Sequence, residues 1–145
     1  VRKHRLTEMF LVEEMNFGWE NVHEIAEQLE HIHSETFFDK MDEILNFPKY
    51  DPHGEPIPDK DGNIIAQDLK KLSECEKHQK VIFTSVTISD DDFLTYLNIK
   101  NLELGKEIEV LAIEKFDKSM TVNIDGCPTV LSKMVCDKIL VKLSH

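Results

Sequence analysis

The chain has 145 residues and a formal net charge of −11 at pH 7, and 41% of its residues are hydrophobic and 31% charged. These values are typical of a folded, soluble protein of one or two small domains, and no apolar run approaches the roughly 18 residues that a membrane-spanning helix needs. An acidic chain repels phosphate backbones, so direct nucleic-acid binding is disfavoured while cation binding is favoured. The three cysteines form no CxxC motif, which favours a reducing, cytoplasmic compartment with unpaired thiols.

Three helices are predicted at the start of the chain, at about residues 3–15, 20–33 and 35–46. Gly18 separates the first two, and Ser34 is a suitable N-cap for the third. The third helix has apolar residues at helical spacing, namely Phe37, Met41, Ile44 and Leu45. Three short helices bury little apolar surface by themselves. We therefore expect a homodimer that covers the remaining apolar residues, which include Phe10, Phe17, Phe37 and Phe38.

The rest of the chain is predicted to be a loop followed by short strands. Four of the five prolines lie in FPKYDPHGEPIP, and a DKDGN turn signal follows, so residues 47–63 should be extended and rich in turns. Strands are predicted in VIFTSVTI (81–88), KEIEVLAIEKF (106–116), MTVNID (120–125) and TVLSKMVCDKILVKL (129–143), the last with a helical turn inside it. One short helix is expected in SDDDFLTYLNI (89–99). The expected fold class is α+β, with a helical domain over residues 1–72 and a compact β-barrel over residues 73–145.

The segment VHEIAEQLEH (22–31) combines an apolar face with a crowded polar face. On 100° steps, the polar residues share one arc of roughly 100°; these are His23, Glu27, Glu30 and His31. The first helix adds His4 and Glu8 at i, i+4 spacing. Side chains at this spacing converge beside a helix, and imidazole with carboxylate suits a divalent ion such as manganese or iron. A solvated polar face is the alternative interpretation.

Motifs of metal-dependent enzymes do not match this pattern. HEIAE begins like the HExxH motif of zinc proteases, but its fifth residue is Glu27 instead of a histidine. A ferritin-like Glu-x-x-His pair would need a glutamate where Gln28 stands. A small di-metal oxidase or hydrolase would also need a bundle that closes around the site, and only three helices are predicted. We expect a protein that is not an enzyme; a metal-free interaction module is the other alternative.

Four segments, in this order and spacing, resemble one known domain: RKHRLTEMFLVE, VHEIAEQLEH, SETFFDKMDEIL and FPKYDPHGEPIP. That domain is the metal-binding and dimerisation domain of the diphtheria toxin repressor family of bacterial metal-dependent transcriptional repressors. The later segments LELGKEIEVLAIEKF and VLSKMVCDKILVKL resemble the family's SH3-like barrel, which is related to the FeoA domain. The resemblance covers essentially the whole chain.

The resemblance implies that the chain senses metal and controls the expression of metal-uptake genes. In that family, a winged-helix domain precedes the dimerisation domain and binds operator DNA. We expect this chain to be a fragment that lacks the winged helix, forms a homodimer, and contacts operator DNA only through that domain. No association with a membrane is expected.

The resemblance also implies two metal sites. The primary site matches Glu27, Glu30 and His31, with further ligands from the winged-helix part. Position 27 is a cysteine in iron-type members of the family and a glutamate in manganese-type members. A carboxylate in place of a thiolate favours hard ions, so Mn²⁺ is preferred and Fe²⁺ stays open.

The ancillary site matches His4, Glu8 and His23, and the resemblance adds three weaker candidates. Asp51 and His53 stand where manganese-type relatives have a Cys-x-His pair, and Asp90 in SDDDF is the expected contributor from the barrel. The alternative for the loop pair is an exposed surface role, and for Asp90 it is capping of the short helix.

Overall fold

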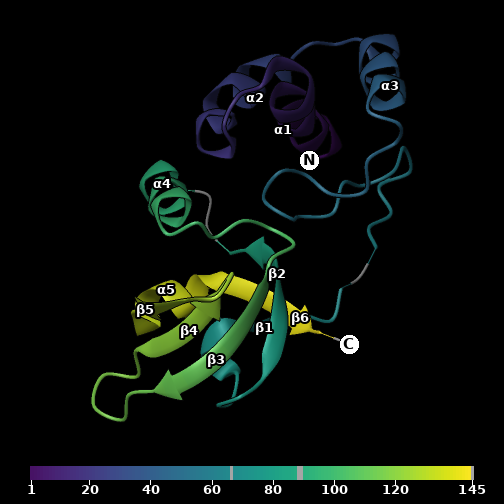
Figure 1. Ribbon diagram of the computed structural model, residues 1–145. Helices are drawn as coiled ribbons and strands as arrows, with labels where there is room; N and C mark the ends of the chain where they lie inside the picture. Colours follow the sequence, from purple (N-terminus) through teal and green to yellow (C-terminus); the bar gives the residue numbers. More distant parts are fainter. Residues whose placement is uncertain (66, 88–89, 145) are drawn as a thin grey trace. The chain divides into compact units, whose positions relative to one another are not determined.

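The computed structural model describes residues 1–65, 67–87 and 90–144 (Figure 1). These residues fall into two compact units, one drawn from residues 1–66 and 89–94 and the other from residues 67–88 and 95–145. Among the described residues, no helix combines the length and the apolar character that a membrane span requires.

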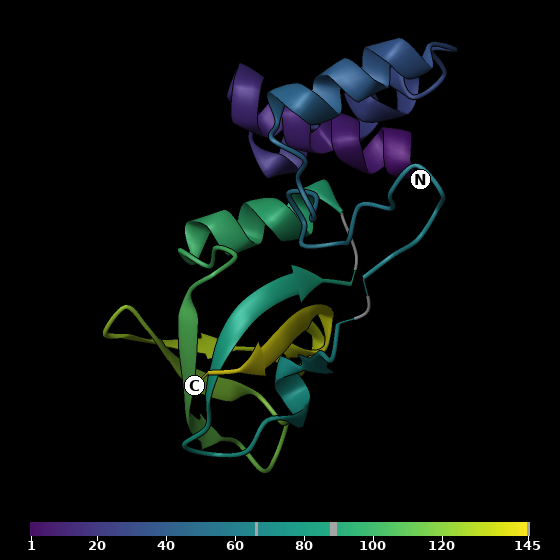
Figure 2. The same cartoon turned by 90° about the vertical axis from the view of Figure 1, so that its right-hand side faces the viewer.

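The first unit is built from short helices, whose bounds are α1 (Arg2–Met15), the 3₁₀ turn η1 (Trp19–Asn21), α2 (His23–Leu29) and α3 (Glu35–Ile44). Both α2 and α3 pack against α1 (Figure 2). The N-cap prediction for α3 is confirmed, because Ser34 Oγ accepts a hydrogen bond of 3.2 Å from the backbone nitrogen of Phe37. α2 is shorter than the predicted 20–33. Ile32 N bonds to Leu29 O in a 3₁₀ manner, and Lys3 Nζ donates to Ile32 O, so the α-helical ladder ends at Leu29.

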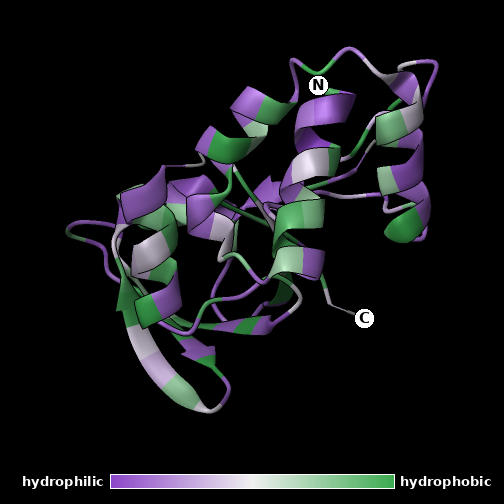
Figure 3. Ribbon diagram, turned by 90° about the horizontal axis from the view of Figure 1, so that it is seen from above, coloured by the Kyte–Doolittle hydropathy of each residue, from purple (hydrophilic) through white to green (hydrophobic). Residues whose placement is uncertain are grey.

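The apolar core of this unit consists of two small clusters that both include α1. Their buried members are Leu6, Phe38 and Met41 in one, and Leu11, Val22 and Ala26 in the other. Hydrophobic and hydrophilic residues alternate along the helices, as expected of elements that bury one face (Figure 3). Phe38, expected on a dimer face, is instead fully buried in the core, whereas Phe37 and Ile44 are 40% and 57% exposed.

The proline-rich segment is an irregular loop, as predicted, but part of it is ordered by its own backbone. Tyr50 and Pro56 form an isolated β-bridge, and Asp51 N donates to Glu55 O at 2.8 Å. Gly54, with φ of 85°, occupies the left-handed conformation that this tight turn requires. Asp51 and His53 are only 4% and 1% exposed, so the turn faces the protein interior and is not a surface linker.

The second unit centres on an antiparallel sheet, which within the described residues has six strands in the order β1-β6-β2-β3-β4-β5. The strands are β1 (Lys70–Lys71), β2 (Lys80–Val86), β3 (Glu107–Ile113), β4 (Met120–Ile124), β5 (Cys127–Leu131) and β6 (Ile139–Leu143). The remaining helical elements are η2 (Leu72–Glu74) and α5 (Lys133–Lys138) in this unit, and α4 (Asp91–Ile99), whose residues are divided between the two units. The α+β class and the predicted short strands are confirmed, but residue 88 of the predicted strand 81–88 and residue 89 of the predicted helix 89–99 lie outside the described residues.

Two features of the sheet were not visible in the sequence pattern. Register shifts occur at Phe83/Ser85 and at Val110/Ala112, and such bulges increase strand bending. The two-residue strand β1 pairs with β6, so the sheet includes residues before position 73. A strand this short has no alternating pattern from which to predict it. The expected domain boundary at residue 72 stays a prediction.

The cysteines differ in accessibility, which gives a test of the barrel core. Cys75 and Cys136 are buried and Cys127 is exposed. Burial raises the pKa of Cys136 to about 12 and also raises the pKa of Cys75, and only the thiolate is a good nucleophile. We expect Cys127 alone to react quickly with a thiol-specific disulfide reagent in the native chain, and all three thiols to react after denaturation. Cys127→Ser should remove the fast phase; a fast phase that persists in this variant would contradict the buried positions.

Candidate metal site

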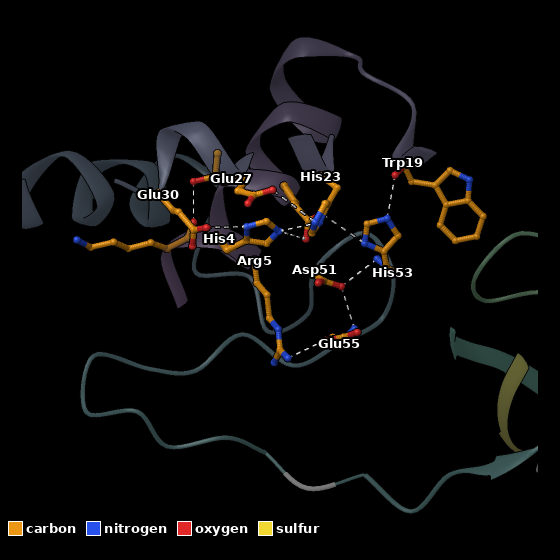
Figure 4. Close-up of polar contacts among 12 residues, drawn as sticks. His4, Arg5, Trp19, His23, Glu27, Glu30, Asp51, His53 and Glu55 are labelled. Carbon is orange, nitrogen blue, oxygen red and sulfur yellow. Dashed lines mark hydrogen bonds and ion pairs between the residues drawn. The ribbon is translucent and has the colours of Figure 1, made fainter. Parts of the chain in front are cut away.

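The side chains predicted for the ancillary site converge between α1 and α2. Glu8 Oε1 lies 3.6 Å from His4 Nε2, and Glu8 Oε2 lies 3.8 Å from His23 Nδ1 (Figure 4). His4 Nε2 and His23 Nδ1 are 3.2 Å apart. One ligand atom from each of these three residues lies within 4.8 Å of the others, which suits a single metal ion. The i, i+4 spacing on α1 and the first position of α2 produce this convergence.

The loop turn brings two more possible metal ligands, Asp51 and His53, close to the Glu8 carboxylate. His53 Nδ1 lies 3.7 Å from Glu8 Oε2, and His53 Nε2 lies 2.8 Å from the carbonyl oxygen of Trp19. A carbonyl oxygen can only accept, so Nε2 carries a proton and Nδ1 is the ring nitrogen that faces Glu8. Asp51 Oδ1 accepts hydrogen bonds of 2.9 Å from the nitrogens of His53 and Glu55. Glu8, Asp51 and His53 therefore form a second possible ligand trio, fully buried, that shares Glu8 with the first.

Glu8 is the electrostatic centre of the site. Its side chain is buried, and its Oε2 has no hydrogen-bond partner among the residues that the structure describes. Burial, helped by the neighbouring carboxylates of Asp51 and Glu55 and opposed by the charge of Arg5, raises the pKa of Glu8 to about 8. Burial also lowers the pKa of His4, which favours the neutral imidazole that a metal needs. A buried carboxylate with one unpartnered oxygen, surrounded by imidazole nitrogens, fits a divalent cation.

The residues predicted for the primary site are only partly brought together. Glu30 Oε1 lies 3.5 Å from His4 Nδ1, and Glu27 Oε2 lies 3.9 Å from His23 Nε2. Both glutamates line a cavity of about 390 Å³ together with His4, Glu8 and His23. His31 is exposed in the turn after α2 and does not line this cavity. The helical spacing that would place His31 beside Glu27 does not apply, because α2 ends at Leu29. Metal binding by this set stays a prediction.

The structure gives Asp90 a helix-capping role. Its Oδ1 accepts hydrogen bonds from the backbone nitrogens of Asp92 and Phe93, at 2.8 and 3.2 Å, at the start of α4. This is the alternative that the sequence left open, and metal binding by Asp90 stays a prediction.

Three residues that shape the site were not singled out from the sequence. The carbonyl of Trp19 orients His53, and the Trp19 and His53 rings stack with centroids 6.0 Å apart. Arg5 Nη2 lies 2.7 Å from Glu55 Oε2. The position of Arg5 three residues before Glu8 indicates a shared helix face, but no local pattern indicates which loop residue Arg5 reaches.

Known protein families match both parts of the chain. The model of the metal-binding and dimerisation domain of iron-dependent repressors matches residues 1–59, and the FeoA domain model matches residues 70–143. A solved manganese-dependent transcriptional repressor in complex with manganese aligns with 99% of this chain and 69% of its own, with a TM-score of 0.93 and 33% sequence identity.

Two curated relatives each match 58 residues of this chain. The iron-dependent repressor IdeR of Mycobacterium tuberculosis is 43% identical over 58 residues, which are 40% of this chain and 25% of IdeR. A probable metal transport system membrane protein of Chlamydia trachomatis is 40% identical over 58 residues, which are 40% of this chain and 13% of that protein. The chain thus spans a quarter or less of the length of these two relatives.

Fold and site together define a helical domain of the metal-binding and dimerisation type joined to a FeoA-type barrel. The chain belongs to the diphtheria toxin repressor family of iron- and manganese-dependent repressors. The resemblance found in the sequence is confirmed.

The raised pKa of Glu8 predicts how the stability of the metal-free chain depends on pH. The folded state holds a proton on Glu8 up to a pKa of about 8, whereas the ordinary value is 4.5. Stability from this group is therefore complete below pH 4.5 and is lost as pH rises towards 8, by roughly 2–4 kcal/mol at about 1.4 kcal/mol per pKa unit.

Chemical unfolding in the presence of a chelator at pH 5, 6.5 and 8 measures this dependence on pH. Glu8→Gln cannot ionise, so it should flatten the loss of stability that the wild-type chain shows over this window. Equal losses in the two proteins would contradict the assignment to Glu8, because the other titrating groups are unchanged between them.

Proposed function

We propose that the chain is the metal-sensing and dimerising part of a transcriptional repressor that responds to Mn²⁺ or Fe²⁺ and regulates metal-uptake genes. The observation that carries this proposal is the convergence of three imidazoles on the buried carboxylate of Glu8. The similarity to a manganese-dependent repressor supports it. In this proposal the chain binds metal and couples that binding to the DNA affinity of the repressor, and we assign it no catalytic role.

The residues that would hold the metal are the two trios that share Glu8. A bound divalent ion would supply the positive charge that this carboxylate lacks. His4 and Glu8 come from α1, His23 from α2, and Asp51 with His53 from the loop, so ligation connects three segments of the helical unit. All of these donors are nitrogen or oxygen atoms, which favours Mn²⁺, with Fe²⁺ as the second choice. Glu27, Glu30 and His31 are the proposed ligands of a primary site, which would need further ligands from the winged-helix domain and a movement of the exposed His31 towards the two glutamates.

A second copy of the chain is the proposed partner of α3. Ile44 and Phe47, at and just after the end of α3, are 57% and 63% exposed, and Phe37 on the same helix is 40% exposed. These residues leave apolar surface that a homodimer would cover. In the repressor, two winged-helix domains held by this dimer contact operator DNA in the cytoplasm. Metal that binds the DNA-competent arrangement more tightly shifts the population towards it.

Calorimetric titration with Mn²⁺ tests the metal site. The wild-type chain should bind Mn²⁺, and Glu8→Ala should weaken binding by roughly tenfold or more, because even residues that only orient metal ligands contribute about that factor. Glu13 is an exposed glutamate on the same helix, so Glu13→Gln removes the same charge away from the site and should bind like the wild type. Absence of Mn²⁺ binding by the wild type, or equal affinity of Glu8→Ala, would refute the proposal.

Sedimentation analysis tests the dimer. Ile44→Lys places a charge in the proposed interface and should convert the dimer to a monomer at micromolar concentration, because burying an unpaired ammonium group is unfavourable. Ile99→Lys is the matched control, since Ile99 on α4 is 74% exposed and lies outside the helical face concerned. A monomeric wild type, or an Ile44→Lys variant that remains dimeric, would contradict this interface.

A further inference from the structure

We propose that Arg5 is a positioning residue, which clamps the loop turn of residues 51–55 against α1 and so presents Asp51 and His53 to Glu8. The effect of Arg5 on metal binding rests on the proposed function. The contact between Arg5 and the turn, however, is also present in the metal-free chain. Arg5 is not a metal ligand, since a guanidinium has no lone-pair donor.

The clamp is a two-point contact made by one side chain. Arg5 Nη2 lies 2.7 Å from Glu55 Oε2, and Arg5 Nη1 donates to the carbonyl oxygen of Pro56 at 2.6 Å (Figure 4). A planar guanidinium that engages two acceptors through separate nitrogens fixes orientation as well as distance. Arg5 and Glu55 are 22% and 35% exposed, so water screens this pair only in part.

Hydrogen bonds within the turn fix the positions of Asp51 and His53 relative to Glu55. Asp51 N donates to Glu55 O, and Asp51 Oδ1 accepts from the nitrogens of both His53 and Glu55. Residues 51, 53 and 55 are therefore tied into one hydrogen-bonded unit that moves as a whole. Holding Glu55 fixes where Asp51 and His53 lie.

α1 contacts this unit at neighbouring points on one face. Arg5 and Glu8 are separated by three positions, which places them on the same side of a helix. Arg5 binds the end of the turn at Glu55 and Pro56. Glu8 Oε2 lies 3.7 Å from His53 Nδ1 in the same turn. Without the guanidinium, the Glu55 carboxylate and the Pro56 carbonyl would lose the partner on α1 that holds them. The turn would then move away from α1.

Positioning and simple electrostatics predict opposite signs for the loss of Arg5. Removing a positive charge beside a cation site should strengthen metal binding if the charge acts only through Coulomb repulsion. Removing a clamp should weaken metal binding, because Asp51 and His53 are no longer held near Glu8. Loss of the Glu55 carboxylate should weaken binding on either account, so the Arg5 variant is the one that separates the two accounts.

A double-mutant cycle in the 145-residue chain provides the test. Arg5→Gln and Glu55→Gln should each reduce Mn²⁺ affinity by roughly tenfold, the typical effect of losing a group that orients metal ligands. The double variant should be no worse than the weaker single variant, because both substitutions remove the same clamp. Arg5→Lys should restore affinity in part, since an ammonium group keeps the charge but cannot match the fork geometry.

Amide hydrogen exchange of residues 51–55 in the metal-free chain is the second measurement. Arg5→Gln should accelerate exchange in this turn. Arg2→Gln is the matched control, because Arg2 on the same helix pairs with Asp42 at 3.2 Å and with Asp39 at 3.6 Å, both of which belong to α3 and not to the turn. The Arg2→Gln variant should show the same hydrogen exchange in the turn and the same Mn²⁺ affinity as the wild type.

The outcomes distinguish this inference from the proposed function. Unchanged or increased Mn²⁺ affinity in Arg5→Gln, or effects of the two single variants that cancel in the double variant, would overturn the positioning role. Unchanged exchange of residues 51–55 in Arg5→Gln would overturn the clamp itself. If the wild type binds no Mn²⁺ while exchange accelerates in Arg5→Gln, the metal function fails and the clamp stands.

Discussion

The burial of the Glu8 carboxylate is the constraint on which the helical unit depends. Glu8 is 3% exposed, and its Oε2 has no hydrogen-bond donor among the described residues. Close to it lie His23 of α2 and His53 of the loop, at 3.8 and 3.7 Å, together with the carboxylate of Asp51. Burial and the neighbouring carboxylates disfavour the ionised form of Glu8, so this side chain favours a proton or a bound cation. A positive charge is therefore favoured at the point where α1, α2 and the loop meet.

α1 connects this charged site to the core of the unit. One face of the helix carries Leu6 and Leu11, which belong to the two apolar clusters, and another carries Arg5 and Glu8, which contact the loop. A ligand that binds Glu8 in the folded state stabilises that state by mass action. Because both clusters include α1, such stabilisation extends to α2 and α3. Metal occupancy is therefore coupled to the order of the whole unit, including the helix proposed to form the dimer.

Local sequence patterns were sufficient to predict the class of the fold and to single out His4 and Glu8 as candidate ligands, whereas His23 was grouped with them only through the family resemblance. Helical spacing located α1 and α3, alternation located most strands, and i, i+4 spacing identified His4 and Glu8. Long-range contacts explain what the patterns could not predict. α2 ends at Leu29, where Lys3 binds the carbonyl of Ile32 from another helix. Likewise, burial of the loop turn depends on Arg5, fifty positions earlier in the chain, reaching Glu55. Such contacts leave no periodic signal near either residue.

The distribution of donor types limits which ions the site can prefer. All three cysteines, Cys75, Cys127 and Cys136, lie in the barrel part of the sequence, and two of them are buried there. The helical unit therefore offers carboxylates and imidazoles without any thiolate. In the loop turn, Asp51 adds a further carboxylate oxygen to this set of possible ligands. Carboxylate oxygens suit hard ions such as Mn²⁺ better than ions that favour sulfur, so a metal bound at the proposed site would be selected by the same acidic residues that give the helical unit its charge.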